Sequence, residues 1–194
     1  MRTLCRTAAV AAALSGTATA QDSIFSNLAA DDSVGTTIGT GTTVFKAGGF
    51  TMTDSYFLDS VTVELIFGSP DDLPALQIWS GAGEPTDFIA DFLTSPLNEA
   101  DTLYTYSTAS ALTLNAGETY WVYFDSVNSE GSFQWRGRTD QGTGIGATAA
   151  GYVFNGNPSG FFNAFEVTAT LVPAPGAAAL LGIGALAATR RRRA

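Results

Sequence analysis

Histidine is absent from this chain of 194 residues, and cysteine and lysine occur once each, as Cys5 and Lys46. Without histidine, zinc sites of the usual nitrogen and sulfur type, Ser-His-Asp triads and acid–base catalysis by imidazole are excluded. A single cysteine allows no disulfide within the chain. Serine–lysine catalysis would have to use Lys46, which no Ser-x-x-Lys motif contains. The absent residue types therefore leave carboxylates as the main catalytic groups.

Basic residues are almost missing from the central part of the chain. Residues 21–171 contain all eighteen acidic residues but only Lys46, Arg136 and Arg138 as bases, which gives a net charge of −15. Such a surface argues against binding nucleic acid, whose phosphates require a basic partner, and against anionic lipid headgroups. It favours solubility and leaves divalent cations such as Ca²⁺ as partners.

The amino-terminal segment, residues 1–20, has the three parts of a secretory signal peptide. Arg2 and Arg6 supply positive charge, residues 8–14 are apolar, and Ala18 and Ala20 form an A-x-A cleavage site. We expect cleavage after Ala20. Cys5 precedes the apolar segment and would leave with the signal, so the mature protein would have no thiol.

The carboxyl-terminal segment, residues 172–194, combines a Pro-x-Pro element with a short apolar run and a cluster of arginines. The run, residues 176–189, covers about 21 Å as a helix, whereas a bilayer core is about 30 Å thick. We therefore expect a transmembrane helix that is held only transiently. Because arginines flanking a span stay in the cytoplasm, the preceding domain would lie outside. The cluster consists of Arg190, Arg191, Arg192 and Arg193.

This order of elements resembles the PEP-CTERM sorting signal of bacterial proteins exported to the surface or the biofilm matrix. Val172, Pro173 and Pro175 match the usual Val-Pro-Glu-Pro, while Ala174 replaces the glutamate. The resemblance implies export by the secretion machinery, transient anchoring in the inner membrane, and removal of the helix by an exosortase-type membrane protease. The alternative is an ordinary membrane tail with its arginines in the cytoplasm.

Short strands separated by turns dominate residues 21–171. Val61, Val63 and Leu65 alternate with polar residues, which is typical of a half-buried strand. We predict an all-β ectodomain, an antiparallel β-sandwich of about eight to ten strands with a jelly-roll-like order. The expected strands lie near 24–27, 42–46, 50–53, 61–67, 75–80, 103–107, 111–114, 118–125, 132–136, 152–155 and 165–171.

The sequence also makes specific predictions for three shorter segments of this domain. Residues 86–93 fit either a strand or one helical turn, and residues 31–32 and 138–151 are predicted as loops. A turn at residues 115–117 between two predicted strands indicates a hairpin. Residues 45–154 also resemble exported bacterial domains called choice-of-anchor, closest to type R, through GFTMTDSYFLDSVTVEL, LQIWSGAGEP, LTLNAGETYWVYF and FQWRG. That resemblance implies attachment to a C-terminal anchor and no defined activity.

Aromatic residues on the strands suggest a carbohydrate-binding surface. In residues 118–125, one set of side chains, with Tyr120 and Phe124, should face the core, and Trp121 and Tyr123 the other side. Trp121, Tyr123 and Trp135 are therefore candidates for stacking on sugar rings, with Arg136 and Arg138 as hydrogen-bond donors. The alternative is that these aromatic residues simply belong to the core.

Acidic pairs are the remaining candidates for chemistry. Aspartates in turns could bind Ca²⁺, but none forms the D-x-[DN]-x-[DN]-G motif, so local hydrogen bonding is the simpler interpretation. A carboxylate-based glycoside hydrolase would need two acids facing each other across a cleft. The pairs are Asp31 with Asp32, Asp71 with Asp72, Asp87 with Asp91, and Asp125 with Glu130.

The termini and the composition together favour an exported surface or extracellular-matrix protein without catalysis, cofactor or metal site of its own. A module that binds extracellular polysaccharide is the alternative. A glycoside hydrolase is the weaker one.

Overall fold

The computed structural model describes residues 21–39, 44–67, 72–93 and 102–173, and these residues form two antiparallel sheets without a helix. The all-β prediction is therefore confirmed, with fourteen strands in these ranges rather than eight to ten. No helix within them is long and apolar enough to span a membrane. The signal peptide and the predicted C-terminal helix lie outside the described residues, and the jelly-roll-like order stays a prediction.

One sheet has eight strands and is built around the longest strand, β4. β14 and β10 pair along one edge of β4, and β7 and β8 pair along the other. β1 adds to β14, and β2 and β13 add to β10. The strands are β1 (Asp22–Ser26), β2 (Asp32–Gly39), β4 (Tyr56–Phe67), β7 (Thr102–Tyr106), β8 (Leu112–Leu114), β10 (Ser132–Arg138), β13 (Phe162–Asn163) and β14 (Phe165–Leu171).

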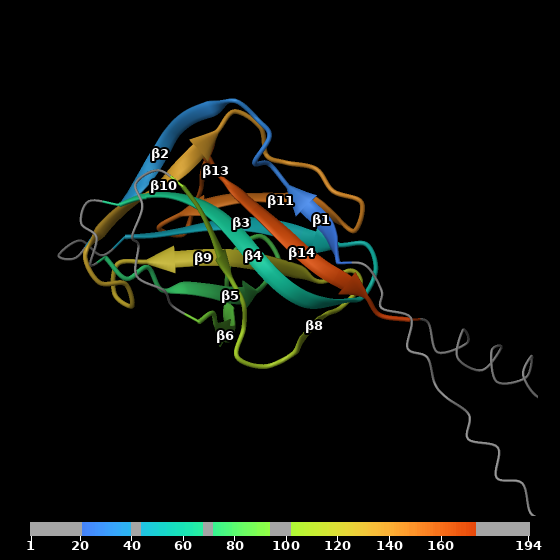
Figure 1. Cartoon of the computed structure of the whole chain (residues 1–194). Coiled ribbons are helices and arrows are strands. Elements are labelled where there is room, and N and C mark those ends of the chain that lie inside the picture. Colours follow the sequence, from blue (N-terminus) through green and yellow to red (C-terminus); the bar gives the residue numbers. More distant parts are fainter. Residues whose placement is uncertain (1–20, 40–43, 68–71, 94–101, 174–194) are drawn as a thin grey trace, which may run out of the picture.

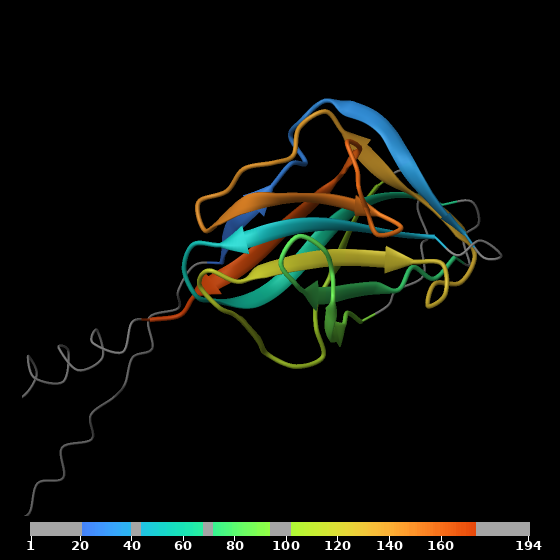
Figure 2. The same ribbon diagram turned by 180° about the vertical axis from the view of Figure 1, so that it is seen from behind.

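The other sheet has six strands in the order β12-β11-β3-β9-β5-β6. Its outer face is turned toward the reader in Figure 2. Residues 86–93, which allowed a strand or a helical turn, contain the edge strand β6. The strands are β3 (Phe45–Met52), β5 (Leu76–Ser80), β6 (Asp87–Asp91), β9 (Thr119–Asp125), β11 (Ala147–Phe154) and β12 (Asn157–Pro158).

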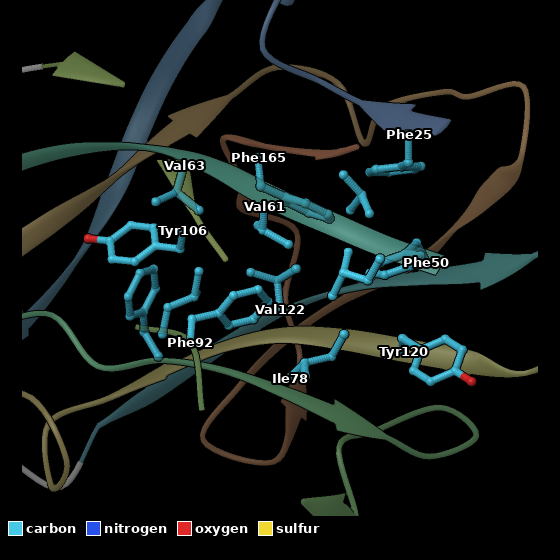
Figure 3. Close-up of a cluster of buried hydrophobic side chains, with 14 of the residues drawn as sticks. Phe25, Phe50, Val61, Val63, Ile78, Phe92, Tyr106, Tyr120, Val122 and Phe165 are labelled. Atoms are coloured by element: carbon cyan, nitrogen blue, oxygen red, sulfur yellow. The ribbon is translucent and has the colours of Figure 1, made fainter. Parts of the chain in front are cut away.

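A single large core lies between the two sheets (Figures 1 and 3). The predicted alternation is confirmed in β4, where Val61, Val63 and Leu65 are fully buried. β14 buries Phe165, Val167 and Ala169 in the same way. The arrangement is therefore sandwich-like, with the inner face of each sheet buried by the other.

Two predicted loops are confirmed only in part, since Asp31 and residues 139–146 do lie between strands, and one predicted hairpin is wrong. Residues 32–39 form strand β2, which pairs with β10 through polar and glycine-rich sequence, and β11 begins at Ala147 inside the predicted loop 138–151. The turn at residues 115–117 does not join a hairpin, because β8 pairs with β4 in one sheet and β9 pairs with β3 and β5 in the other. This turn carries the chain from one sheet to the other.

Asn27 links both sheets at the end of β1. The side chain is almost completely buried. Its Nδ2 donates to the hydroxyl of Tyr152 and to the carbonyl of Asn163, both at 3.0 Å, and its Oδ1 accepts from the backbone N–H of Phe165 at 2.8 Å. One amide therefore connects β11, β13 and β14, and it supplies the acceptor for the buried N–H of Phe165.

Replacing Asn27 by alanine should destabilise the fold by about 2 kcal/mol, because the buried N–H of Phe165 loses its side-chain acceptor. Asn157→Ala is the matched control, since Asn157 is exposed and its Nδ2 bonds only to the carbonyl of Asn155. Urea unfolding measures both variants. Equal stability of Asn27→Ala and the control would contradict this role of Asn27.

Candidate functional site

Two of the three predicted sugar-stacking residues have no exposed face. Trp121 and Trp135 are both fully buried. Trp135 lies in the main core, and its Nε1 donates to the carbonyl of Ala164 at 2.8 Å. Trp121 does point away from that core, as predicted, but its Nε1 donates to the carbonyl of Gly81 at 2.8 Å. Neither tryptophan can stack on a sugar, so this part of the prediction is wrong.

Glycine in β3 explains how Trp121 is buried on an outer sheet face. A Cβ at Gly49 would lie 2.7 Å from the Trp121 ring, so the ring occupies the space that a side chain would fill. The turn after β5 supplies the Gly81 carbonyl that bonds the indole. Alternation along β9 gave the direction of this side chain correctly. The glycine below the ring and the turn beside it decide its burial.

An aromatic row does cross the outer face of the six-stranded sheet, and it contains the third predicted residue, Tyr123. The row is formed by Phe45 of β3, Tyr123 of β9, Trp79 of β5 and Phe88 of β6. Its ring centroids are separated by 5.3, 5.0 and 5.6 Å in that order. The first three rings are half-buried, while Phe88 is 50% exposed at the edge strand. Phe88 therefore offers the most free surface.

Polar side chains flank the row on β5 and β6. The Nε1 of Trp79 donates to Gln77 at 3.0 Å, and the Nε2 of Gln77 donates to Asp91 at 2.8 Å. These bonds fix the Trp79 ring in place. Arg136 and Arg138, predicted as donors to a sugar, lie on β10 in the other sheet and pair with Glu64, and Arg138 also pairs with Asp32. They do not contribute to the row.

A small cleft of about 330 Å³ at one end of this sheet contains two carboxylates, Asp87 and Glu118. Glu118 accepts hydrogen bonds from Tyr120 and Asn115, and these hold the pKa of its carboxyl below the usual value. A glycosidase needs one acid whose pKa is raised so that it can donate a proton. Because the pKa of Glu118 is shifted in the opposite direction, Glu118 does not fit the role of the proton donor.

Several aspartates of the acidic pairs have local or structural partners. Asp125 caps the following turn by accepting from the N–H groups of Val127 and Asn128, and Asp72 accepts from the N–H of Ser132 at 3.1 Å. Within the described ranges, no three His, Cys, Asp or Glu side chains gather in a way that could hold a metal ion. Asp71 lies outside those ranges.

Lys46, the single lysine, lies at the inner end of a second cavity of about 630 Å³ between β2 and the β11–β12 hairpin. Its side chain points between the sheets and is fully buried. The Nζ donates to Ser159 at 2.5 Å and to the carbonyl of Phe161 at 2.8 Å. The pair Asn155-Gly156, with φ of 48° and 77°, turns the hairpin. Asn-Gly is a strong sequence signal for such a turn, and it could have located this cavity wall.

Of the predicted sorting residues, the structure describes Val172 and Pro173. They follow directly on β14, and the N–H of Val172 donates to the carbonyl of Ser55 at 2.9 Å. Pro173 is exposed. The other predicted residues, Ala18, Ala20, Pro175 and the four arginines, lie outside the described residues. The motif thus begins where the last strand ends.

The burial of Lys46 predicts how stability depends on pH. Desolvation lowers the pKa of Lys46 from 10.5 to about 8 in the folded protein. Between these two pH values the unfolded chain binds more protons than the folded one, so the free energy of unfolding should rise with pH. Burial raises the pKa of Tyr120 to about 12, so stability should fall again above about pH 10. The melting temperature of the wild type should therefore rise from about pH 7.5 to 9.5, whereas that of Lys46→Met should not. The same slope in both proteins would refute the assignment.

Comparison with known proteins assigns no family to this chain. No protein-family model matches the sequence, and no curated protein matches it. The function of the aromatic row and of the Lys46 cavity must therefore be inferred from their own geometry.

Proposed function

We propose that this chain is an exported protein of the cell surface or extracellular matrix. In this proposal, residues 21–171 form the exported domain and the two terminal segments are sorting signals. Residues 1–20 direct secretion, and residues 172–194 anchor the chain transiently in the inner membrane until an exosortase-type protease removes the helix. The domain itself has no catalytic role in this proposal, and it needs no cofactor.

The observation that supports the proposal is that the first and the last strand of the domain lie side by side. Asp22 of β1 pairs with Ala169 of β14, so Gln21 and Pro173, the first and last described residues, lie at the same end of the eight-stranded sheet. In Figure 1 the start of β1 and the end of β14 lie together at this end. A domain held there, close to the membrane, presents its opposite end and both outer sheet faces to the exterior.

Intact-mass analysis of the protein from producing cells, with and without the processing protease, tests this proposal. With the protease, the mass should correspond to a chain that starts at Gln21 and lacks the arginine cluster. Without the protease, the arginine cluster should be retained and the chain should stay with membranes. Full-length protein dissolved in the cytoplasm would contradict the proposal, because neither signal would then have acted.

A second candidate function, polysaccharide binding, is favoured by the aromatic row. Its free surface lies at Phe88, beside the bonded group of Trp79, Gln77 and Asp91, which supplies polar atoms for sugar hydroxyls. The net charge of the domain disfavours polymers of acidic sugars. We therefore expect neutral polysaccharides, contacted by stacking on the edge of the six-stranded sheet.

Phe88→Ala should weaken retardation of the protein in gels that contain neutral glucan, xylan or mannan by about fivefold or more, because it removes the most exposed ring of the row. Phe57→Ala is the matched control: Phe57 is 41% exposed but lies on β4 in the other sheet, so its loss should change nothing. Retardation that is absent in the wild type, or equally reduced in both variants, would exclude the row as a sugar site.

A further inference from the structure

The cavity above Lys46 has the dimensions of a small-molecule site. Its volume of about 630 Å³ lies within the range of about 300–1,000 Å³ that is usual for ligand pockets. One wall is formed by residues 34–37 of β2, and the other by residues 154–161, which include the β11–β12 hairpin. Lys46 lies near the start of β3, and β3 starts at the end of the domain opposite the start of β1 and the end of β14 (Figures 1 and 2). The cavity is therefore accessible when the domain is held by its termini.

Apolar side chains are concentrated at the mouth of this cavity. Val34 is 69% exposed, Phe154 39% and Phe161 60%, and all three line it. Large exposed apolar side chains cost solubility, and their clustering around a hollow is typical of binding sites. These three come from both walls, so an apolar ligand body placed between them would contact both.

The charge of the cavity is opposite to that of the domain. None of its lining residues is acidic, and Lys46 is its one ionisable residue. Burial lowers the pKa of Lys46 to about 8, so the amine is still an ammonium at pH 7. Within the described residues this ammonium has no carboxylate partner: it bonds to the neutral oxygens of Ser159 and Phe161 and lies over the Tyr152 ring, 5.7 Å from its centroid. A buried charge without a counter-ion is costly, and an anion in the cavity would offset that cost.

Ser159 connects the buried ammonium with the cavity. Its Oγ accepts hydrogen bonds from the Nζ of Lys46 and from the N–H of Phe161. The only acceptor for its own hydroxyl proton among the described residues is the carbonyl of Phe161 at 3.5 Å, a long contact. The Ser159 hydroxyl, polarised by the ammonium behind it, is thus free to turn and donate to a ligand.

We propose that this cavity binds a small organic carboxylate with an apolar ring system. The ring system lies between Val34, Phe154 and Phe161, and the carboxylate accepts a hydrogen bond from Ser159 in the field of Lys46. This site is separate from the aromatic row and does not depend on the route of export.

Isothermal titration with 2-naphthoate and with its neutral isostere 2-naphthamide tests the proposal, using the full chain purified from producing cells. At pH 7 the carboxylate should bind at least about tenfold more tightly than the amide, because only the carboxylate gains the charged hydrogen bond. This preference should disappear as the pH rises through about 8 to 9.5, where Lys46 loses its proton. Equal affinity for both probes at pH 7, or no binding of either at millimolar concentration, would overturn the proposal.

Three variants separate the ring pocket from the anion site. Ser159→Ala and Lys46→Met should reduce the affinity for naphthoate to that for the amide, whereas Phe161→Ala should weaken both probes equally. Val127→Ala, which changes an exposed apolar residue outside the cavity lining, should change neither. If Lys46→Met does not fold, the anion site is tested by Ser159→Ala together with the pH dependence of naphthoate binding to the wild type. Unchanged discrimination between the probes in Ser159→Ala would refute the assigned contact.

Discussion

The glycine pair in β3 is the constraint on which the packing of this domain depends. A Cβ at Gly48 would lie 2.6 Å from the Phe165 ring, and one at Gly49 would lie 2.7 Å from the Trp121 ring. Aromatic rings therefore press on the same strand from both faces, Phe165 from the core and Trp121 from outside. A side chain at either position would force one ring away from the sheet. Because these two glycines have no side chains, aromatic rings can cover both faces of β3 at this point.

This constraint also places the outer aromatic row. Because the Trp121 ring lies flat over Gly49 and is bonded to the turn after β5, the next outward residues, Tyr123 and Trp79, are the ones that contact each other. Phe45 and Phe88 extend the contact to the neighbouring strands on each side. The row thus passes beside the buried Trp121, whose partner on β5 is Trp79.

Local patterns in the sequence predicted the parts of the fold that depend on one strand at a time. Residues 61–65 of β4, strand β9 and residues 165–169 of β14 alternate between apolar and polar or between two apolar sets, and their inward residues are those expected. β2 was missed because its sequence, DSVGTTIG, is polar, and it buries only Ile38 completely. The hairpin predicted at residues 115–117 was wrong for a related reason. A turn sequence indicates that the chain reverses its direction, but it does not indicate which sheet the next strand joins.

The candidate sites were harder to predict, because exposure depends on residues far away in the sequence. Alternation gave the direction of Trp121 but could not show that Gly49 and Gly81 would bury it. Likewise, the sequence places Lys46 at the end of a predicted strand but does not show that the loop containing Ser159 and Phe161 covers its amine. The near absence of bases from the sequence did, however, single out Lys46, and the structure gives that residue a distinct environment.

In the proposed arrangement, the domain is displayed outside the cell, and the end that carries Gln21 and Pro173 faces the membrane. Val127→Cys provides the most direct test, because this residue is 74% exposed and would be the only thiol once residues 1–20 are removed. It follows β9, which ends at the side of the domain opposite the start of β1 and the end of β14. Intact producing cells are treated with a membrane-impermeant maleimide, with wild-type cells as the background. The account predicts labelling of Val127→Cys before lysis and none of the wild type. Labelling that appears only after the cells are broken would contradict it.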